Sequence, residues 1–473
     1  MIADVVVIGA GVVGACCARA CAEAGLSVVV VDRGPVAGGT TGGGEGNILV
    51  SDKEPGPELD LALLSRELWA QMAGSLGDSF ELDPKGGLVV AATSETYAHL
   101  LRFADEQRAC GVVAEPVAAV DLPGLEPRIS PDLAGGVFYP QDMQVQPMLA
   151  AAHIIEAARA TGRATLMTEC AVMGIDVDAS GAICGVRTAQ GVISTRYVIN
   201  AAGTWGGEIA ALAGVDLPIL PRRGFILVTE PLPPIVRHKV YAADYVANVA
   251  SDNAGLETSA VIEGTKSGTI LIGASRERVG FDKTVDWQVL GRLARQAIDV
   301  FPFLADVSLL RTYGGFRPYC PDHLPVIGPD PRVTGLMHAC GHEGAGVGLA
   351  AATGHVIAQS ITGESMSIDL TPFRPRASRP AMSGEVAQVG FTFDGTPYRA
   401  QVGQTVAAAL MDHGIIAWRR TRVDDQPRGI LCGIGVCFDC LITLNGEPNV
   451  RACMTRVEPG DDLRSQEGTG YAR

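Results

Sequence analysis

The chain has 473 residues, which is too long for one compact core and predicts two or three domains. Its composition, 47% apolar and 19% charged, excludes a disordered chain, and its net charge of −15 without a basic run argues against nucleic-acid binding. Asp4 stands where a secretory signal carries positive charge, and no uncharged apolar run is long enough to span a membrane, so we expect a cytoplasmic protein.

The first elements of the chain form the pattern of a nucleotide-binding βαβ unit. Residues 4–8 (DVVVI) predict a buried strand, a helix follows up to residue 24, and LSVVVVD predicts a second strand that ends at Asp32. Three glycines, Gly9, Gly11 and Gly14, follow the first strand. Glycines at this spacing allow a tight turn, a close approach of pyrophosphate and close packing of the helix, while Asp32 is placed to bind ribose. The pattern predicts a dinucleotide site, for NAD or FAD.

Three later segments favour FAD over NAD. Residues 39–52 form a glycine-rich loop directly after the second strand, and residues 197–210 predict a strand that ends in small residues. Residues 335–363 predict a strand, a glycine-rich turn and a helix, whose N–H groups and dipole suit a flavin ring. A nicotinamide enzyme does not need segments so far apart. The residues expected to contact FAD are Gly9, Gly11, Gly14, Asp32, Arg33, Thr40, Thr41, Gly46, Asn47, Ala202, Gly203, Trp205, Gly341, His342, Gly344, Gly346 and Val347.

The spacing of these segments resembles the D-amino-acid-oxidase-type (DAO) flavoproteins, which include glycine oxidase, sarcosine oxidase and the flavin subunits of opine oxidase, hydrogen cyanide synthase and D-hydroxyproline dehydrogenase. The similarity extends through 268–282 (GTILIGASRERVGFD) and 313–329 (YGGFRPYCPDHLPVIGP). It implies a first domain, residues 1–373, with a Rossmann-like α/β FAD-binding part and a substrate part built on an antiparallel sheet. The FAD-binding segments are expected near 1–80, 145–215 and 310–370, and the substrate-binding segments near 81–144 and 216–309.

The resemblance also implies a residue that holds the substrate. In that family an arginine in a G-[FL]-R-P segment binds the substrate carboxylate over the flavin, and Arg317 occupies this place in residues 315–318. A guanidinium suits the role because it holds a carboxylate through two parallel hydrogen bonds, which fix its orientation as well as its charge. The alternative is a structural arginine paired with Asp322 or Glu343.

Three more side chains are candidates for the catalytic site. Tyr241 and Tyr245 are expected to line the substrate pocket, with a place in the core as the alternative. His342, together with Glu343, is expected to contact flavin or substrate, with a pair that caps the turn as the alternative. The chain shows no context for a Ser/His/Asp triad and no HExxH motif, so the expected chemistry is hydride transfer rather than hydrolysis.

The last part of the chain predicts an iron-sulfur domain. Residues 374–385 are rich in proline, arginine and serine and are expected to be a linker, which leaves residues 386–473 for a hairpin, a helix and a cysteine-rich loop. The four cysteines expected to bind metal are Cys432, Cys437, Cys440 and Cys453. The C-x4-C-x2-C spacing of the first three is typical of plant-type [2Fe–2S] proteins, in which Gly433 and Gly435 would let the loop wrap the cluster; a zinc site is the alternative. We predict an α+β ferredoxin-like [2Fe–2S] domain.

This tail resembles the small ferredoxin-like domains of opine oxidase and hydrogen cyanide synthase. In those assemblies the iron-sulfur unit and the DAO-type unit are often separate, whereas here they are fused. The resemblance implies a hetero-oligomer with a larger second subunit that binds flavin or nucleotide, and an FMN at the subunit interface. A self-contained monomer or homodimer is the alternative.

The two ends of the chain together predict an FAD- and [2Fe–2S]-dependent dehydrogenase. The expected reaction converts the C–N bond of a carboxylate-bearing secondary or D-configured amine to an imine, and the expected substrates are an opine, D-hydroxyproline, sarcosine or glycine. Electrons would leave through the cluster to a partner or acceptor. Two alternatives remain open: an O₂-using amino acid oxidase with a structural cluster, and an electron-transfer or assembly subunit whose chemistry occurs on a partner.

Overall fold

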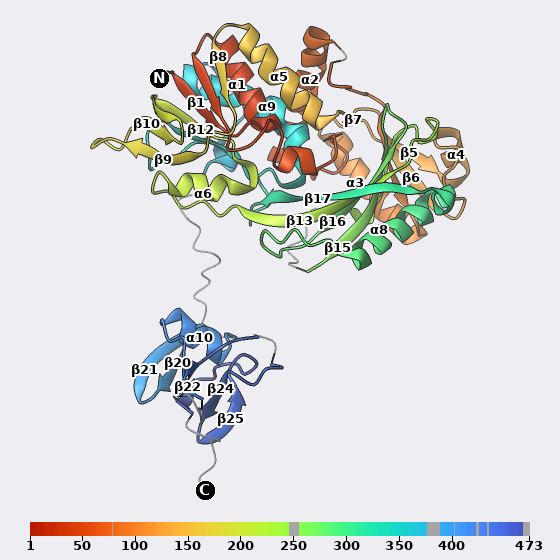
Figure 1. Cartoon of the computed structure of the whole chain (residues 1–473). Helices are drawn as coiled ribbons and strands as arrows, with labels where there is room; N and C mark the ends of the chain where they lie inside the picture. The colour runs from red at the N-terminus through yellow and green to blue at the C-terminus, as the bar shows by residue number, and fades with distance from the viewer. Residues whose placement is uncertain are drawn as a thin grey trace. The chain divides into compact units, whose positions relative to one another are not determined.

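The computed structural model describes residues 1–77, 79–245, 255–375, 388–401, 403–421, 425–432 and 435–466. The chain divides into a large unit, Met1–Ala377, and a small unit, Ser378–Arg473, each with its own sheets and its own apolar core (Figure 1). Of the expected linker, 374–385, only Arg374 and Pro375 belong to the described part of the chain. No helix within the described ranges has both the length and the apolar character needed to cross a bilayer.

A six-stranded sheet forms the centre of one half of the large unit. Its strands, in spatial order, are β18 (Val326–Pro329), β19 (Leu336–Cys340), β12 (Tyr197–Asn200), β1 (Val5–Ile8), β2 (Val28–Val31) and β8 (Ala164–Met167). All neighbouring strands are parallel except β18 and β19. Because β1 and β2 consist of valine and isoleucine alone, both faces of the sheet are buried, as is usual for parallel sheets.

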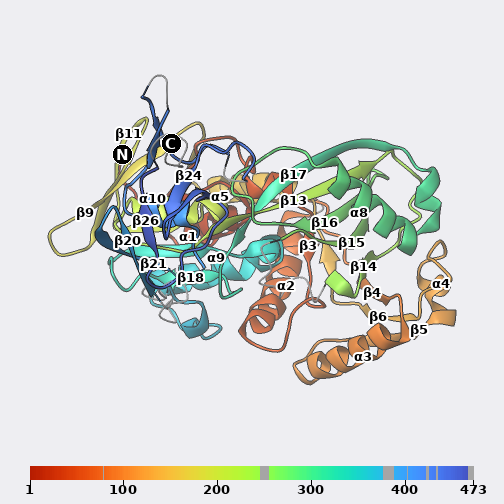
Figure 2. The ribbon, with the colours of Figure 1, turned by 90° about the horizontal axis from the view of Figure 1, so that it is seen from below.

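Alternate residues of β1 pack into two different layers. Val5 and Val7 belong to the core that the helices cover, whereas Val6 and Ile8 belong to the core on the opposite face. The helical layer consists of α1 (Val12–Glu23), α5 (Pro147–Ala160) and α9 (Gly346–Thr362), with α2 (Pro57–Leu76) packed on α9 (Figures 1 and 2). The other layer consists of the three-stranded sheet β11 (Gly191–Ser194), β10 (Ile183–Thr188) and β9 (Val172–Val177), together with α6 (Gly206–Ala211).

The second half of the large unit is built on an eight-stranded sheet. Its strands, in spatial order, are β17 (Leu309–Tyr319), β13 (Leu220–Thr229), β16 (Ile270–Arg276), β15 (Glu257–Gly264), β14 (Lys239–Ala242), β4 (Gly87–Ala91), β6 (Gly135–Tyr139) and β5 (Glu115–Ala118). All neighbours are antiparallel except β14 and β4. Helix α8 (Trp287–Val300) packs against β13, β15 and β16, and α3 (Ser94–Ala109) packs against β4 and β6.

Strand β17 differs from the segment boundaries expected from the sequence. Residues 310–370 were expected to serve the FAD-binding part, but β17 pairs antiparallel with β13 from Leu220↔Tyr319 to Thr229↔Leu309 and is therefore the edge strand of the eight-stranded sheet. Strand β17 joins this sheet because its long antiparallel pairing with β13 supplies many backbone hydrogen bonds, although β18, the next strand in the chain, belongs to the six-stranded sheet. Arg317 consequently projects from the eight-stranded sheet.

Short elements connect these sheets. They are η1 (Thr40–Gly43), β3 (Asn47–Ile48), η2 (Ala119–Asp121), α4 (Leu122–Leu125), β7 (Met143–Gln144), η3 (Gly203–Trp205), η4 (Pro302–Asp306), η5 (Glu343–Ala345) and η6 (Thr371–Phe373), where η marks a 3-10 helix. Strands β3 and β7 pair with each other, and η1 and η3 contact β17. These contacts place the loops that follow β2 and β12 next to the eight-stranded sheet.

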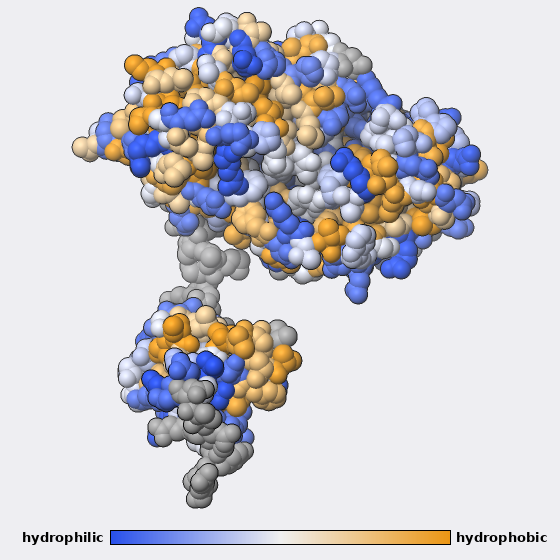
Figure 3. Space-filling model, viewed as in Figure 1, coloured by the Kyte–Doolittle hydropathy of each residue, from blue (hydrophilic) through white to orange (hydrophobic). Residues whose placement is uncertain are grey.

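Within its described residues, the small unit contains a five-stranded sheet and one helix. The strands, in spatial order, are β21 (Thr396–Gln401), β20 (Gln388–Phe393), β26 (Asp462–Arg464), β24 (Leu441–Leu444) and β25 (Glu447–Arg451), and a separate pair is formed by β22 (Arg419–Arg420) and β23 (Pro427–Arg428). Helix α10 (Val406–Asp412) is capped by Thr405, whose hydroxyl accepts a hydrogen bond from the Ala408 N–H. Figure 3 shows apolar side chains gathered on one side of this unit.

Candidate functional site

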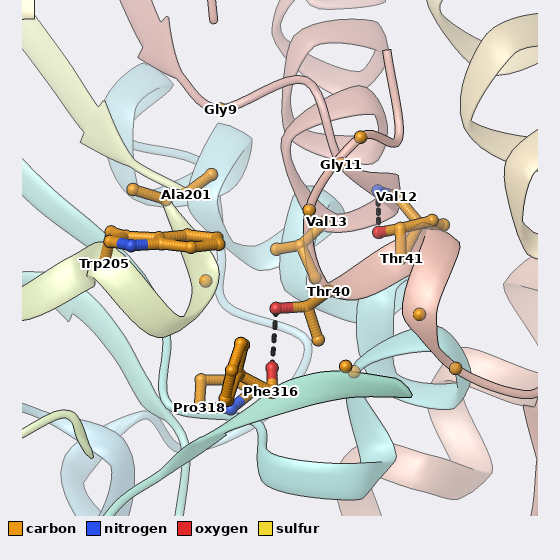
Figure 4. Close-up of a pocket in the computed structure, with 18 of the residues that line it drawn as sticks. Gly9, Gly11, Val12, Val13, Thr40, Thr41, Ala201, Trp205, Phe316 and Pro318 are labelled. Atoms are coloured by element: carbon orange, nitrogen blue, oxygen red, sulfur yellow. Dashed lines mark hydrogen bonds between the residues drawn. The ribbon is translucent and has the colours of Figure 1, made fainter. Parts of the chain in front are cut away.

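A cavity of about 540 Å³ lies in the large unit, where β1, β2 and β12 end close to β13 and β17. Most of the residues expected to contact FAD are in its wall, namely Gly9, Gly11, Asp32, Arg33, Thr40, Thr41, Asn47, Ala202, Gly203, Trp205, His342, Gly344, Gly346 and Val347. In Figure 4 the turn that carries Gly9 and Gly11 lies on one side of the cavity, with Phe316 and Pro318 on the opposite side. The fold therefore brings the three expected segments to one place.

The glycines after β1 make room for a ligand at the start of α1. A Cβ atom at Gly9, whose φ is 114°, would lie 2.4 Å from the carbonyl oxygen of Ala201, and one at Gly11 would lie 2.9 Å from the hydroxyl of Thr41. Helix α1 begins at Val12, and its N-cap residue, Gly11, has no side chain to cover the helix end. The start of this helix thus presents backbone and its positive dipole end to the cavity, which fits the pyrophosphate of a dinucleotide.

Three of the expected FAD contacts do not line the cavity and have packing roles. A Cβ atom at Gly14 would lie 1.9 Å from the Gly9 carbonyl oxygen, so this glycine lets α1 pack on the turn after β1. Added Cβ atoms would also lie 1.6 Å from the Val145 carbonyl oxygen at Gly46 and 2.9 Å from Ile219 at Gly341. Gly46 and Gly341 pack closely against protein atoms and lie outside the cavity wall, and their contact with FAD stays a sequence-based prediction.

The acid and the arginine at the end of β2 are fixed at the cavity wall. The carboxylate of Asp32 accepts hydrogen bonds from the backbone N–H groups of Ala10 (2.7 Å) and Gly34 (2.9 Å). The guanidinium of Arg33 lies 4.3 Å from the ring centre of Trp205, a cation–π arrangement. Segments that follow β2 and β12 are thereby joined beside the cavity.

The glycine-rich loop after β2 is attached to β17. The hydroxyl of Thr40 donates a hydrogen bond to the carbonyl oxygen of Phe316 at 2.9 Å (Figure 4). A Cβ atom at Gly315 would lie 2.8 Å from the carbonyl oxygen of Gly43, so the two backbones meet directly. This contact sets the distance between the dinucleotide turn and the strand that carries Arg317.

Glu45 is a cavity residue that the sequence reasoning missed. Its carboxylate is buried, accepts a hydrogen bond from the Asn47 side chain at 3.3 Å, and has a second oxygen without a hydrogen-bond partner in the described structure. Burial raises the pKa of Glu45, with Lys239 acting in the opposite direction. Lys239 lies on β14 and contacts Asn47 and Glu263. The available signal in the sequence was an acidic residue inside a glycine-rich loop. Its role could not be predicted from that signal, because the residues around Glu45 come from distant strands.

A second cavity of about 230 Å³ adjoins the first and shares five wall residues with it. The shared residues are Tyr245, Arg317, His342, Glu343 and Gly344. Arg317 donates a hydrogen bond to the Ser275 carbonyl oxygen at 2.8 Å, and among the described residues it forms no ion pair. The expected alternative of a pair with Asp322 or Glu343 is therefore not what the structure contains. Glu343 instead pairs with Arg222 and His323.

The two tyrosines have different places. Tyr245 is buried and lines both cavities, whereas Tyr241 lies in the core, where its hydroxyl is hydrogen-bonded to Ser51. The expectation that Tyr241 lines the pocket is thus wrong, because β14 directs this ring into the core that α2 and β3 share.

His342 is buried and uncharged at neutral pH. Its Nε2 lies 3.0 Å from the hydroxyl of Thr353 on α9, and burial lowers the pKa of His342 to about 3. Helix α9 is held in turn by α2, because Ser65 and Trp69 donate hydrogen bonds to the carbonyl oxygens of Gly348 and Val347. The wall formed by the start of α9 is therefore rigidly placed.

The four cysteines of the small unit lie on the loop before β24 and just after β25. Cys440 and Cys453 belong to the apolar core, Cys432 and Cys437 are partly exposed, and burial raises the pKa of Cys440. The Asp439 N–H lies 3.4 Å from the Cys437 sulfur, in hydrogen-bonding geometry.

Four thiols are the ligand set of a [2Fe–2S] cluster. Among the described residues no three His, Cys, Asp or Glu side chains converge as they do around a single metal ion. Of the two loop glycines, Gly435 has a φ of 78°, and Gly433 lies outside the described residues. The four cysteines as a donor set fit the cluster, and their roles as individual ligands remain the sequence-based expectation.

Comparison with known proteins agrees with both sites. Residues 4–360 match the DAO family, described as FAD dependent oxidoreductase, and residues 386–468 match a 2Fe-2S iron-sulfur cluster binding domain. The hydrogen cyanide synthase subunit HcnC of Pseudomonas aeruginosa is 30% identical over 429 residues, covering 80% of this chain and 96% of that protein. Glycine oxidase of Pseudomonas putida is 28% identical over 382 residues, covering 79% of this chain and 98% of that protein.

The fold has a solved counterpart. The crystal structure of glycine oxidase from Geobacillus kaustophilus has a TM-score of 0.72 and 26% identity, covering 80% of this chain and 99% of that one. The expected resemblance and the expected fold class are thus confirmed. The chain belongs to the FAD dependent oxidoreductase (DAO) family and carries a C-terminal 2Fe-2S domain, so it is an oxidoreductase whose cofactors are FAD and a [2Fe–2S] cluster.

Proposed function

We propose that this chain is a dehydrogenase that oxidises the C–N bond of a carboxylate-bearing amine to an imine and passes the electrons out through the [2Fe–2S] cluster. The observation that carries the proposal is Arg317, a cation without a carboxylate partner among the described residues, at the junction of the two cavities. When bound, FAD supplies a hydride acceptor that exchanges electrons singly or in pairs, and the cluster supplies a one-electron carrier.

Arg317 binds the carboxylate and thereby fixes the orientation of the substrate. Its position on β17 is set by the close contact of Gly315 with Gly43. A guanidinium holds a carboxylate in a planar, two-bonded arrangement, so the bond to be oxidised points in one direction only. The glycine oxidase relative, by its name, acts on an amine with one carboxylate, which supports this substrate class.

Two wall residues beside Arg317, His342 and Tyr245, add no charge to the cavity at neutral pH. His342 remains neutral at physiological pH because of its burial, and Tyr245 keeps its proton because burial raises its pKa. Neither side chain is a strong base, so the amine has to bind in its neutral form before it loses hydride. The reaction therefore depends on orientation rather than on proton abstraction by a side chain.

A second subunit is part of the proposal. The cluster needs an acceptor, and one relative is named as a subunit of hydrogen cyanide synthase. We infer a hetero-oligomer with a larger flavin- or nucleotide-binding partner, with FMN at the interface as a further expectation. Purification of the tagged chain from its native host tests this, and a chain that emerges alone and reduces dye as fast as the cell extract contradicts it.

Anaerobic bleaching of the flavin absorbance by glycine, sarcosine, D-proline and iminodiacetate tests the activity. We expect at least one amine to bleach the purified holoenzyme. We expect Arg317→Ala to cost about 3–5 kcal/mol of transition-state stabilisation, which lowers kcat/KM for that amine roughly 10²- to 10⁴-fold, with FAD content unchanged. Normal bleaching by the variant would assign Arg317 a structural role. Stoichiometric hydrogen peroxide formation by the native enzyme with O₂ as efficient acceptor would favour the oxidase alternative.

A further inference from the structure

Most buried cations of the large unit have carboxylate partners. Arg222 pairs with Glu257 and Glu343, and Arg223 pairs with Glu277 and Asp282. The two buried lysines follow the same rule, with ion pairs Lys239–Glu263, Lys53–Asp52 and Lys53–Glu58. This is the usual arrangement, because a buried charge without a partner strongly destabilises a fold.

Arg276 departs from this rule. Only 5% of its surface is exposed, yet its side chain forms neither an ion pair nor a hydrogen bond among the described residues. The guanidinium carbon lies 5.1 Å from the centre of the Tyr245 ring, a cation–π arrangement. Arg276 is the last residue of β16 and lies in the wall of the second cavity, as does Arg317. Its donors therefore have space in front of them rather than protein acceptors.

The two guanidinium groups share this cavity. Arg317 is bonded to the carbonyl oxygen of Ser275, the neighbour of Arg276. Burial, and next the positive charge of Arg276, lower the pKa of Arg317, so the two charges repel each other.

Five carboxylates line the cavity, and three of them are engaged by other cations. Of the other two, Asp322 accepts a hydrogen bond from the Leu324 N–H, and neither Asp322 nor Glu54 forms an ion pair among the described residues. Burial raises the pKa of Glu343, but its bonds to His323 and Arg222, and also the charge of Arg276, lower it. Asp52 and Glu58 pair with Lys53. The described protein thus leaves both guanidinium groups of the cavity without a carboxylate to bind.

We propose that Arg276 binds a second carboxylate of the substrate, which makes the substrate an amine with two carboxylates. The inference rests on the proposed function, in which Arg317 holds the first carboxylate. The two oxygens of one carboxylate accept the two parallel hydrogen bonds that one guanidinium donates. A second guanidinium in the same cavity therefore has donors for a second carboxylate. Arg276 is then a specificity-determining residue, and the bond oxidised lies between the nitrogen and a carbon next to the carboxylate held by Arg317.

Matched substrate pairs test the inference. Iminodiacetate and N-ethylglycine differ by one carboxylate in place of a methyl group, as do N-(2-carboxyethyl)glycine and N-propylglycine. With the full-length holoenzyme under anaerobic conditions, we expect kcat/KM for flavin bleaching to be about 100-fold higher for the dicarboxylate of at least one pair, the scale of a charge-assisted hydrogen bond. Equal use of both members of both pairs would overturn the inference.

Substitution of Arg276 distinguishes a role in binding the second carboxylate from a role in supporting Arg317, which holds the first. We expect Arg276→Gln to lower kcat/KM much more for the dicarboxylate than for the monocarboxylate, so that most of the preference is lost, and Arg276→Lys to restore part of it. Arg278→Gln is the control, because it removes a charge two residues away that lines neither cavity. An equal loss for both members of a pair would mean that Arg276 only supports Arg317, which would also overturn the inference.

Failure of the proposed function has a different signature. If none of these amines bleaches the flavin, the proposed oxidation is wrong, whatever Arg276 binds. Binding then decides the inference, through titration of the flavin absorbance with iminodiacetate and N-ethylglycine in native enzyme and Arg276→Gln. Tighter binding of iminodiacetate that the variant loses would support the second carboxylate site, and equal binding of the two amines would overturn it.

Discussion

In the large unit the cavity wall is assembled from residues between Ile8 and Val347, whereas in the small unit the four cysteines lie between Cys432 and Cys453. The first site is brought together by two sheets, and several of its glycines mark places where two chain segments meet. The second is a set of side chains close in sequence, carried by one loop and the end of β25. A site whose ligands lie close together in the sequence can be predicted from their spacing. A site formed by contacts between distant segments can be predicted only when the tertiary structure is known.

Because the two sites are built from separate segments of the chain, we predict that a substitution can remove either one while the other remains. Cys437→Ser should abolish the visible absorption and the iron of the cluster, because a [2Fe–2S] cluster needs all four cysteine ligands, while FAD content stays at the native level. Iron analysis and flavin extraction of the purified variant check this. Loss of FAD together with iron would show that the two units depend on each other for folding.

The converse change removes FAD from the large unit. In Gly14→Ala the added Cβ would lie 1.9 Å from the Gly9 carbonyl oxygen, so α1 has to move away from the turn that faces the pyrophosphate. We expect FAD affinity to fall by about 100-fold or more, with full iron content. Gly291→Ala in α8 is the control, since its Cβ would meet nothing within 4 Å and should leave FAD binding unchanged. Native FAD affinity in Gly14→Ala would contradict the packing role.

A smaller effect tests how far the cluster site depends on its own core. Trp418 is buried in the small unit and donates a hydrogen bond from Nε1 to the carbonyl oxygen of Cys440 at 3.1 Å. The same carbonyl oxygen also accepts a hydrogen bond from the Ala452 N–H, so Trp418→Phe removes one of its two bonds and should destabilise the small unit by about 0.5–1.5 kcal/mol. The midpoint of cluster loss in urea measures it. An unchanged midpoint would mean that the cysteine ligands alone hold the loop.

A pH dependence of stability is expected in the large unit. Burial raises the pKa of Asp142 to about 7, although Ser51 and Val50 donate hydrogen bonds to its carboxyl group. Because the folded pKa lies above the unfolded value of 3.8, this group's contribution to stability is complete below pH 3.8 and is lost as the pH rises through 7. Relative to Asp142→Asn, native protein should lose about 1.4 kcal/mol per pH unit between these values.

Calorimetry of the holoenzyme at pH 4.5, 6 and 7.5 measures this difference. The unfolding temperature of the native protein should fall relative to that of Asp142→Asn as the pH rises. Parallel profiles for the two proteins would mean that Asp142 is ionised in the folded state throughout. Asp142 lines neither cavity of the large unit, so FAD binding is expected to be the same in both proteins.

The sequence by itself determined the cofactors and the order of the units. The βαβ pattern with Gly9, Gly11 and Asp32, and the spacing of the cysteines, are local features whose chemistry follows from residue type and separation, and the family matches confirm FAD and [2Fe–2S]. The helix that begins after Thr405 was predictable for the same reason, since its cap is only one residue from the helix.

Only the tertiary structure decided which side chains face the substrate cavity. Tyr241 and Tyr245 are four residues apart and both are buried in the same core, yet only Tyr245 also lines the two cavities. Arg276 and Glu45 carry no motif, and their importance follows from the partners they lack, which are set by distant strands. Burial and the pairing of charges depend on every segment that packs nearby, and the spacing of residues along the chain does not contain that information.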